Sequence, residues 1–135
     1  MFKDTIFGIN FLHGHYMAHR DIKPANIMKV DDLSWKLLDY GIGENIQVLA
    51  DHSEQTDVQI QKGKFTLSGT PNYMAPILKS RYLAARQNVL EDVKMIDIDL
   101  FKADVYSLGL TFLQAATNLK IDKINESPDY MELAE

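Results

Sequence analysis

Apolar residues recur about every 3.6 positions at the start of the chain, at Phe2, Ile6, Ile9 and Tyr16. This spacing predicts a helix over residues 2–16 with one buried face. The aromatic residues of this segment are expected to pack in the core: Phe2, Phe7, Phe11 and Tyr16.

Two short apolar runs, residues 27–30 and 35–38, come next. Because four mostly polar residues separate them, they predict a β-hairpin. The polar stretch before them, residues 19–26, contains Pro24. It is expected to be a loop, since the residue before a proline avoids the helical region.

Two further helices are predicted in the second half of the chain, over residues 78–90 and 102–119. Before them, residues 42–70 are mostly polar, so we expect either a functional loop or a disordered one. The acidic residues 91–99 are expected to form a solvated loop. Residues 120–135 are polar and acidic and are expected to fray.

The composition is that of one globular domain, with 135 residues, 46% hydrophobic and 24% charged. A net charge of −5 does not favour nucleic acid or an anionic membrane as a partner. Cysteine is absent, which excludes disulfides and thiolate metal sites. With no signal peptide and no apolar run long enough to span a bilayer, the sequence predicts a cytoplasmic protein, with the nucleus as an alternative.

Two polar motifs flank the predicted hairpin. Residues 19–26 read His-Arg-Asp-Ile-Lys-Pro-Ala-Asn, and Asp39-Tyr40-Gly41 follows the second strand. The hairpin would fold the chain back so that Asn26 and Asp39 meet at one end, within reach of a shared metal. Taken singly, each acid or amide is an ordinary turn residue. Their ordered spacing favours one shared site.

These motifs resemble the catalytic loop and the metal-binding loop of protein kinases, H-R-D-x-K-x-x-N and D-F-G. Ser68-Gly69-Thr70-Pro71 with Met74-Ala75-Pro76 resembles the end of the activation segment, and residues 102–109 resemble the start of a long buried helix. The resemblance covers residues 1–119 and implies an α+β, protein kinase-like fold. It would be a partial domain, a mainly helical C-terminal lobe with a small β-hairpin and the N-terminal lobe absent. Residues 120–135 would be a polar acidic tail.

The activity implied by the resemblance is transfer of the ATP γ-phosphate to serine or threonine hydroxyls of a protein substrate. Asp21 would accept or orient the hydroxyl proton, and Lys23 would reach the transferring phosphate as a point charge. Lysine at this position resembles the serine/threonine class. Thr70, expected to pack near Asp21, supports the same class. The implied catalytic residues are Asp21, Lys23, Asn26 and Thr70.

The cofactors implied by the resemblance are ATP and Mg²⁺. Asn26 and Asp39 would hold magnesium, which is a hard cation that prefers oxygen ligands. Met28 would lie under the adenine. The implied cofactor-binding residues are Lys23, Asn26, Met28 and Asp39.

Other matched positions would have structural or regulatory roles. Arg20 would bind a phosphorylated residue of the activation segment, a charge-assisted pairing. His19 and Tyr40, the latter followed by Gly41, would stack in a hydrophobic column. Asp104 would cap the buried helix and accept hydrogen bonds from the catalytic-loop backbone, although it could also be a simple helix N-terminal acid. The candidate phosphorylated residues are Thr66 and Ser68, followed by Ser53 and Thr56.

The sequence also departs from the family pattern. No G-x-G-x-x-G segment, strand lysine or glutamate partner occurs in the 135 residues, so an N-terminal lobe needed to clamp ATP is expected to be missing. Ile77 stands where the glutamate of Ala-Pro-Glu is usual. The alternative is therefore a truncated, non-catalytic kinase remnant that acts as a protein-binding module. A metal site on His13 and His15 with His19 or His52 is rejected, because positions two apart on a helix face different sides, no cysteine assists and His19 has another implied role.

Overall fold

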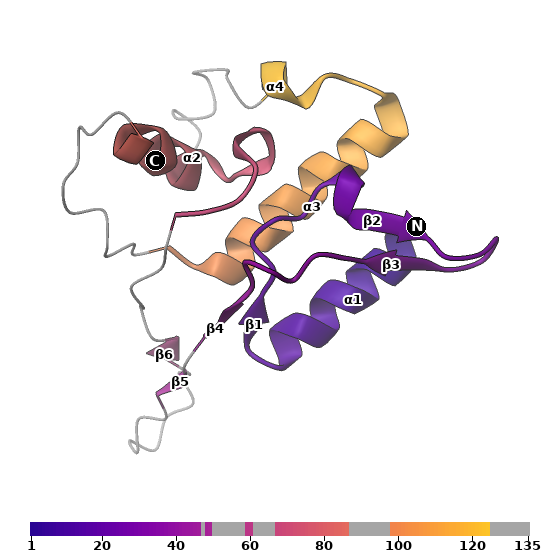
Figure 1. The fold of residues 1–135 in the computed structure, drawn as a ribbon, viewed down its shortest axis with the longest axis horizontal. Helices are drawn as coiled ribbons and strands as arrows, with labels where there is room; N and C mark the ends of the chain where they lie inside the picture. Colours follow the sequence, from indigo (N-terminus) through magenta and orange to yellow (C-terminus); the bar gives the residue numbers. More distant parts are fainter. Residues whose placement is uncertain (47, 50–58, 61–66, 87–97, 125–135) are drawn as a thin grey trace.

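The computed structural model describes residues 1–46, 48–49, 59–60, 67–86 and 98–124, and it has an α+β architecture (Figure 1). The helices are α1 (Phe2–Gly14), α2 (Pro76–Arg86), α3 (Leu100–Thr117) and α4 (Ile121–Ile124), with short 3-10 turns η1 (Pro24–Asn26) and η2 (Pro71–Tyr73). The strands are β1 (Met17–Ala18), β2 (Ile27–Lys29), β3 (Trp35–Leu37), β4 (Glu44–Asn45), β5 (Val48–Leu49) and β6 (Gln59–Ile60). In the described residues they form antiparallel pairs: β1 with β4, β2 with β3 and β5 with β6.

Helices α1 and α3 pack against each other in opposite directions. Phe2 at the start of α1 contacts Phe112 near the end of α3, with ring centroids 4.4 Å apart. His13 at the end of α1 contacts Phe101 at the start of α3, with centroids 4.7 Å apart. These two contacts fix the relative position of the helices along their length.

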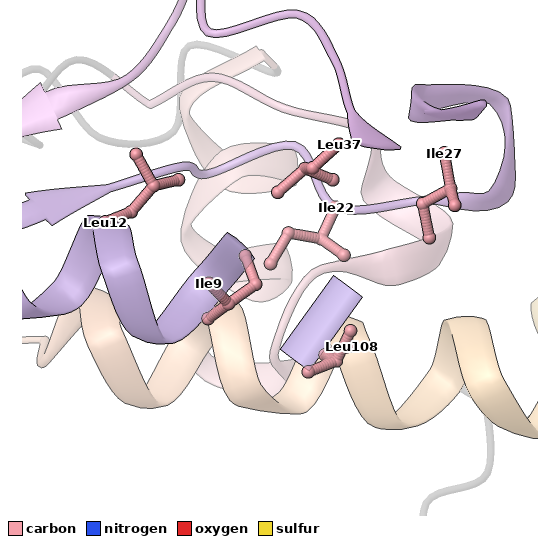
Figure 2. Close-up of a cluster of buried hydrophobic side chains, with 6 residues drawn as sticks. All are labelled: Ile9, Leu12, Ile22, Ile27, Leu37 and Leu108. Carbon is pink, nitrogen blue, oxygen red and sulfur yellow. The ribbon is translucent and has the colours of Figure 1, made fainter. Parts of the chain in front are cut away.

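The main core joins this helix pair to the hairpin and to the polar loop at 19–26. Its buried residues come from α1, the loop, both hairpin strands and α3 (Figure 2): Ile9, Leu12, Ile22, Ile27, Leu37 and Leu108. Ile22 is fully buried, at 0% exposure. Since Ile22 lies between Asp21 and Lys23, the core directly anchors the loop that carries the candidate site.

The helix predicted over residues 2–16 is present but ends at Gly14, and the prediction that its aromatic residues are in the core is wrong. Phe2, Phe7, Phe11 and Tyr16 are exposed, with 43–64% of their surface accessible. The buried face of α1 is formed instead by Thr5, Ile9 and Leu12. Thr5 can be buried because its hydroxyl donates to the Met1 carbonyl at 3.0 Å. The predicted helix is therefore confirmed, whereas most residues of its buried face differ from those predicted.

The predicted hairpin is confirmed, with Ile27 opposite Leu37 and Lys29 opposite Trp35. Asp31 stabilises its turn, since Oδ1 accepts from the backbone N–H groups of Leu33 and Ser34, both at 2.8 Å. A second contact ties the hairpin to α1: the Trp35 N–H donates to Asp4 Oδ2 at 3.0 Å. The hairpin is therefore fixed at both its turn and its edge.

The later helices differ from their predicted bounds. Helix α3 begins at Leu100 rather than 102, because Asp99 caps it by accepting from the N–H groups of Phe101 and Lys102 at 3.0 and 3.1 Å. The prediction that Asp104 caps this helix is therefore wrong, as it lies inside α3. Helix α2 begins at Pro76, and residues 87–90 of the prediction lie outside the described residues.

Several remaining predictions concern residues that lie partly outside the described ranges. These include 91–97 of the acidic loop and the candidate phosphorylation positions Ser53, Thr56 and Thr66. Within the expected tail, Ile121 begins α4 and is buried, at 3% exposure. Residues 125–135 lie outside the description, so the boundary at 119 stays a prediction.

Candidate functional site

The β1–β4 pairing brings together two segments that the sequence did not predict to meet. Ala18 lies opposite Glu44, and the Ile46 N–H donates to the Tyr16 carbonyl at 2.7 Å. The chain that follows Asp39 thus returns beside the chain that leads into His19. This pairing fixes the beginning of the 19–26 loop from one side.

Asp104 fixes the same loop from the side of α3. Its side chain is almost fully buried, and its two oxygens accept from the backbone N–H groups of His19 and Arg20, both at 2.7 Å. His13 Nε2 lies 2.9 Å from Asp104 Oδ2 and adds a third partner. Arg20 has φ of +73°, an uncommon backbone conformation for a side-chain-bearing residue, and these hydrogen bonds help to hold it there. The hydrogen bonds expected from Asp104 to the loop backbone are present.

Asp21, Lys23 and Thr70 form a closed set of hydrogen bonds. The Thr70 hydroxyl donates to Asp21 Oδ1 at 2.7 Å and accepts from Lys23 Nζ at 2.7 Å. Lys23 Nζ also lies 2.8 Å from Asp21 Oδ2. Each of the three groups therefore orients the other two, although Thr70 is far from the loop in sequence.

The environment keeps Asp21 ionised. Burial raises the pKa of its carboxyl, but hydrogen bonds from Lys23, Thr70 and Asn26 and the positive charge of Lys23 outweigh burial, so the pKa lies below its ordinary value. At neutral pH the side chain is a carboxylate and can only accept hydrogen bonds.

Asn26 is turned toward Asp21. Its amide nitrogen donates to the Asp21 carbonyl at 2.8 Å and to Asp21 Oδ2 at 3.2 Å. The use of the nitrogen in these bonds makes the amide oxygen the atom that a cation could contact.

Asp39 lies at the same end of the hairpin as Asn26. The Leu38 N–H donates to the Asn26 carbonyl at 2.8 Å, which places the next residue, Asp39, beside Asn26. Asp39 is exposed, with φ of +64°, and its Oδ1 accepts from the Gly41 N–H at 3.3 Å. One amide oxygen and one carboxylate suit a hard divalent cation that completes its shell with water and phosphate oxygens. Within the described residues, no group of three or more His, Cys, Asp or Glu side chains could hold a metal.

His19 and Tyr40 are in contact, although not as a parallel stack. Their rings meet edge to face, with centroids 5.3 Å apart. The His19 ring is held by two further bonds, since Nε2 donates to the Leu38 carbonyl at 3.0 Å and Nδ1 accepts from the Asp21 N–H at 3.2 Å. The Tyr40 hydroxyl donates to the Leu37 carbonyl at 2.8 Å, a bond that phenylalanine could not make. Met28, in β2, is exposed.

Arg20 reaches two segments outside its own loop. Nη1 donates to Glu44 Oε2 at 3.0 Å and to the Ile42 carbonyl at 3.3 Å, and Nη2 donates to Ser68 Oγ at 2.8 Å. Among the described residues, Ser68 is the phosphorylation candidate that lies at Arg20. The partner that sequence reasoning missed is Glu44.

His13 and Gly69 were also missed as parts of the site. His13 was considered only as a metal ligand, and its contact with Asp104 depends on how α1 packs on α3. Gly69 has φ of +121°, and a Cβ there would lie 2.7 Å from the Arg20 carbonyl. A glycine between Ser68 and Thr70 was a visible signal of close backbone approach.

Comparison with known families decides what kind of domain this is. The protein kinase domain family matches residues 1–132. The chain belongs to the protein kinase family. Its match to this family extends past residue 119, where the motif resemblance ended.

Several known kinases are similar to this kinase chain. The serine/threonine-protein kinase pakF of Dictyostelium discoideum is 30% identical over 87% of the chain, and germinal center kinase 3 of Caenorhabditis elegans is 32% identical over 85%. The dual specificity protein kinase zak2 of Dictyostelium discoideum is 31% identical over 84%. The chain spans only 8%, 16% and 15% of these three relatives, respectively. No helix in the described part of this kinase chain is long and apolar enough to cross a membrane.

Proposed function

We propose that this chain is the catalytic, C-terminal-lobe part of a serine/threonine protein kinase that transfers the ATP γ-phosphate to protein hydroxyl groups. The observation that carries the proposal is the hydrogen-bonded set of Asp21, Lys23 and Thr70. Phosphoryl transfer needs positioning and charge neutralisation more than covalent help from the protein. This set supplies an acceptor, a cation and a hydroxyl that holds both in place.

Asp21 orients the substrate hydroxyl in this proposal. It is ionised at neutral pH and carries the acceptor oxygens that such a hydroxyl requires. Thr70 and Asn26 fix its two oxygens by donating to Oδ1 and Oδ2, respectively. Lys23 Nζ lies 2.8 Å from Asp21 Oδ2 and neutralises negative charge on the phosphoryl group that is transferred.

Asn26 and Asp39 are proposed to hold magnesium, and Met28 to lie under the adenine of ATP. Magnesium, when bound, neutralises charge on the phosphates. The proposal is supported by the position of Asn26 and Asp39 at one end of the hairpin. Residues that clamp the adenine and the inner phosphates in the family are not among the 135 residues, so we assign that task to a separate N-terminal lobe.

The serine/threonine assignment rests on two positions, Lys23 and Thr70. Their 2.7 Å contact ties the segment that would face the substrate to the loop that would perform the transfer. We assign residues 1–119 to the lobe and 120–135 to a tail whose first part, α4, packs against η2 of the lobe. We also propose a cytoplasmic location, with the nucleus as the alternative.

A phosphotransfer assay tests the proposal. The protein kinase domain that contains these residues is given Mg-ATP and peptides carrying serine, threonine or tyrosine. We expect transfer to serine and threonine, and we expect Asp21→Asn to lower kcat by about 10²–10⁴-fold with the KM for ATP nearly unchanged. Asp32→Asn is the matched control, because the Asp32 side chain is 97% exposed on the hairpin turn.

Two outcomes would contradict this function. Undiminished turnover in Asp21→Asn removes the proposed role of Asp21. A wild-type domain that is folded and binds protein ligands but transfers no phosphate favours the non-catalytic binding module instead.

A further inference from the structure

Arg20 has a carboxylate partner within the fold, Glu44. Its side chain is 7% exposed, and Nη1 lies 3.0 Å from Glu44 Oε2, whose own side chain is 38% exposed. Glu44 is in β4, opposite Ala18 of β1. Because Arg20 lies two residues after Ala18, the strand pairing places the Glu44 carboxylate near the Arg20 guanidinium. Arg20 is thus paired within the fold, without any modification of the chain.

The buried charge of Arg20 requires nearby negative charge, which Glu44 supplies together with Asp104. Burial lowers the pKa of the guanidinium, and the negative charges of Glu44 and Asp104 act against that effect. Asp104 is held by the backbone N–H groups of His19 and Arg20. Removing the charge of Glu44 would leave a largely buried cation with less compensation, which is costly.

The same guanidinium reaches the segment that carries Thr70. Nη2 donates to Ser68 Oγ at 2.8 Å. Gly69 follows, so close to the loop that a Cβ would lie 2.7 Å from the Arg20 carbonyl. Thr70 then contacts Asp21 at 2.7 Å. Arg20 therefore links β4, residues 68–70 and the 19–26 loop.

We propose that Glu44 is a positioning residue: its carboxylate supplies the counter-charge of Arg20, so that residues 68–70 are held against Asp21 without phosphorylation of the chain. A phosphorylated residue is the partner that the family resemblance implied for Arg20. Among the described residues, Glu44 accepts from Nη1 of this guanidinium and Ser68 accepts from Nη2. The inference rests on the proposed function only in naming Asp21 as the group that is positioned.

The Arg20–Glu44 pairing predicts how a negative charge on Ser68 would act. A negative group on Ser68 would share the guanidinium with Glu44, and the two like charges would repel each other. Added charge at Ser68 should therefore loosen the segment when Glu44 is ionised. It should tighten the segment when Glu44 has been replaced by a neutral residue.

Hydrogen exchange of backbone amides tests the inference without ATP or substrate. The phosphatase-treated protein, its unmodified mass verified by mass spectrometry, is compared with Glu44→Gln, Ser68→Glu and the double variant. Peptides covering residues 18–22 and 67–75 are followed. We expect these peptides to exchange about tenfold faster in Glu44→Gln and in Ser68→Glu, and near the wild-type rate in the double variant. The control is Asp32→Asn, which removes an exposed charge and should leave both peptides unchanged.

Either of two results would overturn the inference. One is wild-type protection in Glu44→Gln. The other is fast exchange in the phosphatase-treated wild type together with protection only after phosphorylation. If Glu44→Gln fails to fold, Ser68→Glu in the wild-type background decides alone, and slower or unchanged exchange there contradicts the proposal. Because the readout is exchange, a protein that lacks phosphotransfer altogether can still pass or fail this test.

Discussion

The Thr70 hydroxyl has two partners of opposite charge. It donates to the Asp21 carboxylate and accepts from the Lys23 ammonium, each at 2.7 Å. A hydroxyl can do both at once because it has one donor and two acceptor lone pairs. Serine could preserve this pattern, whereas valine keeps the shape and removes both bonds.

Thr70→Val is expected to lower the free energy of unfolding at pH 7 by about 1–3 kcal/mol, because hydrogen bonds to charged groups are lost in a partly buried site. Urea denaturation followed by circular dichroism measures the change. Thr117→Val is the matched control, since the Thr117 hydroxyl donates to the Leu113 carbonyl on an exposed helical turn. If Thr70→Val lowers the free energy of unfolding no more than Thr117→Val does, the hydrogen bonds around Asp21 contribute little to stability.

The stability difference between wild type and Thr70→Val is expected to depend on pH. The pKa of Asp21 is lowered in the folded protein, so its carboxylate contributes stability that is fully present above the unfolded value of about 3.9. That contribution is lost as the pH falls through the lowered folded pKa. The stability gap between wild type and Thr70→Val should therefore be constant near neutrality and shrink below about pH 4.

At the scale of elements, the approach of residues 68–70 to the 19–26 loop depends on Gly69. Its φ of +121° lies in a region that side-chain-bearing residues rarely adopt, and no room exists for a Cβ beside the Arg20 carbonyl. Strain and steric overlap act together, and both would be relieved by movement of the segment away from the loop.

Gly69→Ala is expected to destabilise the protein by about 1–3 kcal/mol or more and to speed amide exchange in residues 67–75. Gly109→Ala is an informative control, because Gly109 lies inside α3 and, apart from its chain neighbours and the nearby backbone of its own helix, no described atom lies within 4 Å of an added Cβ. That change should stabilise the protein by about 0.5–1 kcal/mol through helix propensity. Stability changes of opposite sign in the two Gly→Ala variants would separate the effect of local geometry at Gly69 from a general effect of alanine.

The elements that sequence reasoning predicted are those with a strong local signal. The hairpin has two apolar runs around a turn rich in aspartate, and Asp31 makes the expected turn contacts. Helices α1 and α3 have periodic apolar positions. Strands β1 and β4 have two residues each, too few for any periodicity, so their pairing and the Arg20–Glu44 contact could not be predicted.

The wrong predictions for individual side chains have a different physical cause. Exposed aromatics on α1 were assigned to the core from residue type, while Thr5 was overlooked because its burial requires a local hydrogen bond to Met1. The resemblance implies that Asp104 caps the buried helix, but Asp99 precedes it in the chain and its side chain caps α3 instead. The contacts of Asp104 with the loop backbone, which the resemblance also implies, are present, since its carboxylate accepts from the N–H groups of His19 and Arg20.

At the scale of the whole molecule, the candidate site is built onto the core rather than onto a surface loop. Ile22 is enclosed by residues of α1, the hairpin and α3, as Figure 2 shows. Its neighbours in sequence, Asp21 and Lys23, point instead toward Thr70. Packing of one side chain thus sets the position of the two polar groups that flank it.

Shortening Ile22 should therefore affect stability and the site together. Ile22→Ala is expected to cost about 2–5 kcal/mol and Ile22→Val about 0.5–1.5 kcal/mol, from lost contacts and the cavity left behind. Ile77→Ala, at a position 52% exposed, should stay within about 0.5 kcal/mol of wild type. Urea denaturation gives these values, and amide exchange over residues 18–22 reports on the loop. If Ile22→Val accelerates exchange in that loop more than in α1 and α3, the isoleucine anchors the site specifically. Equal acceleration everywhere would mean that it only contributes to global stability.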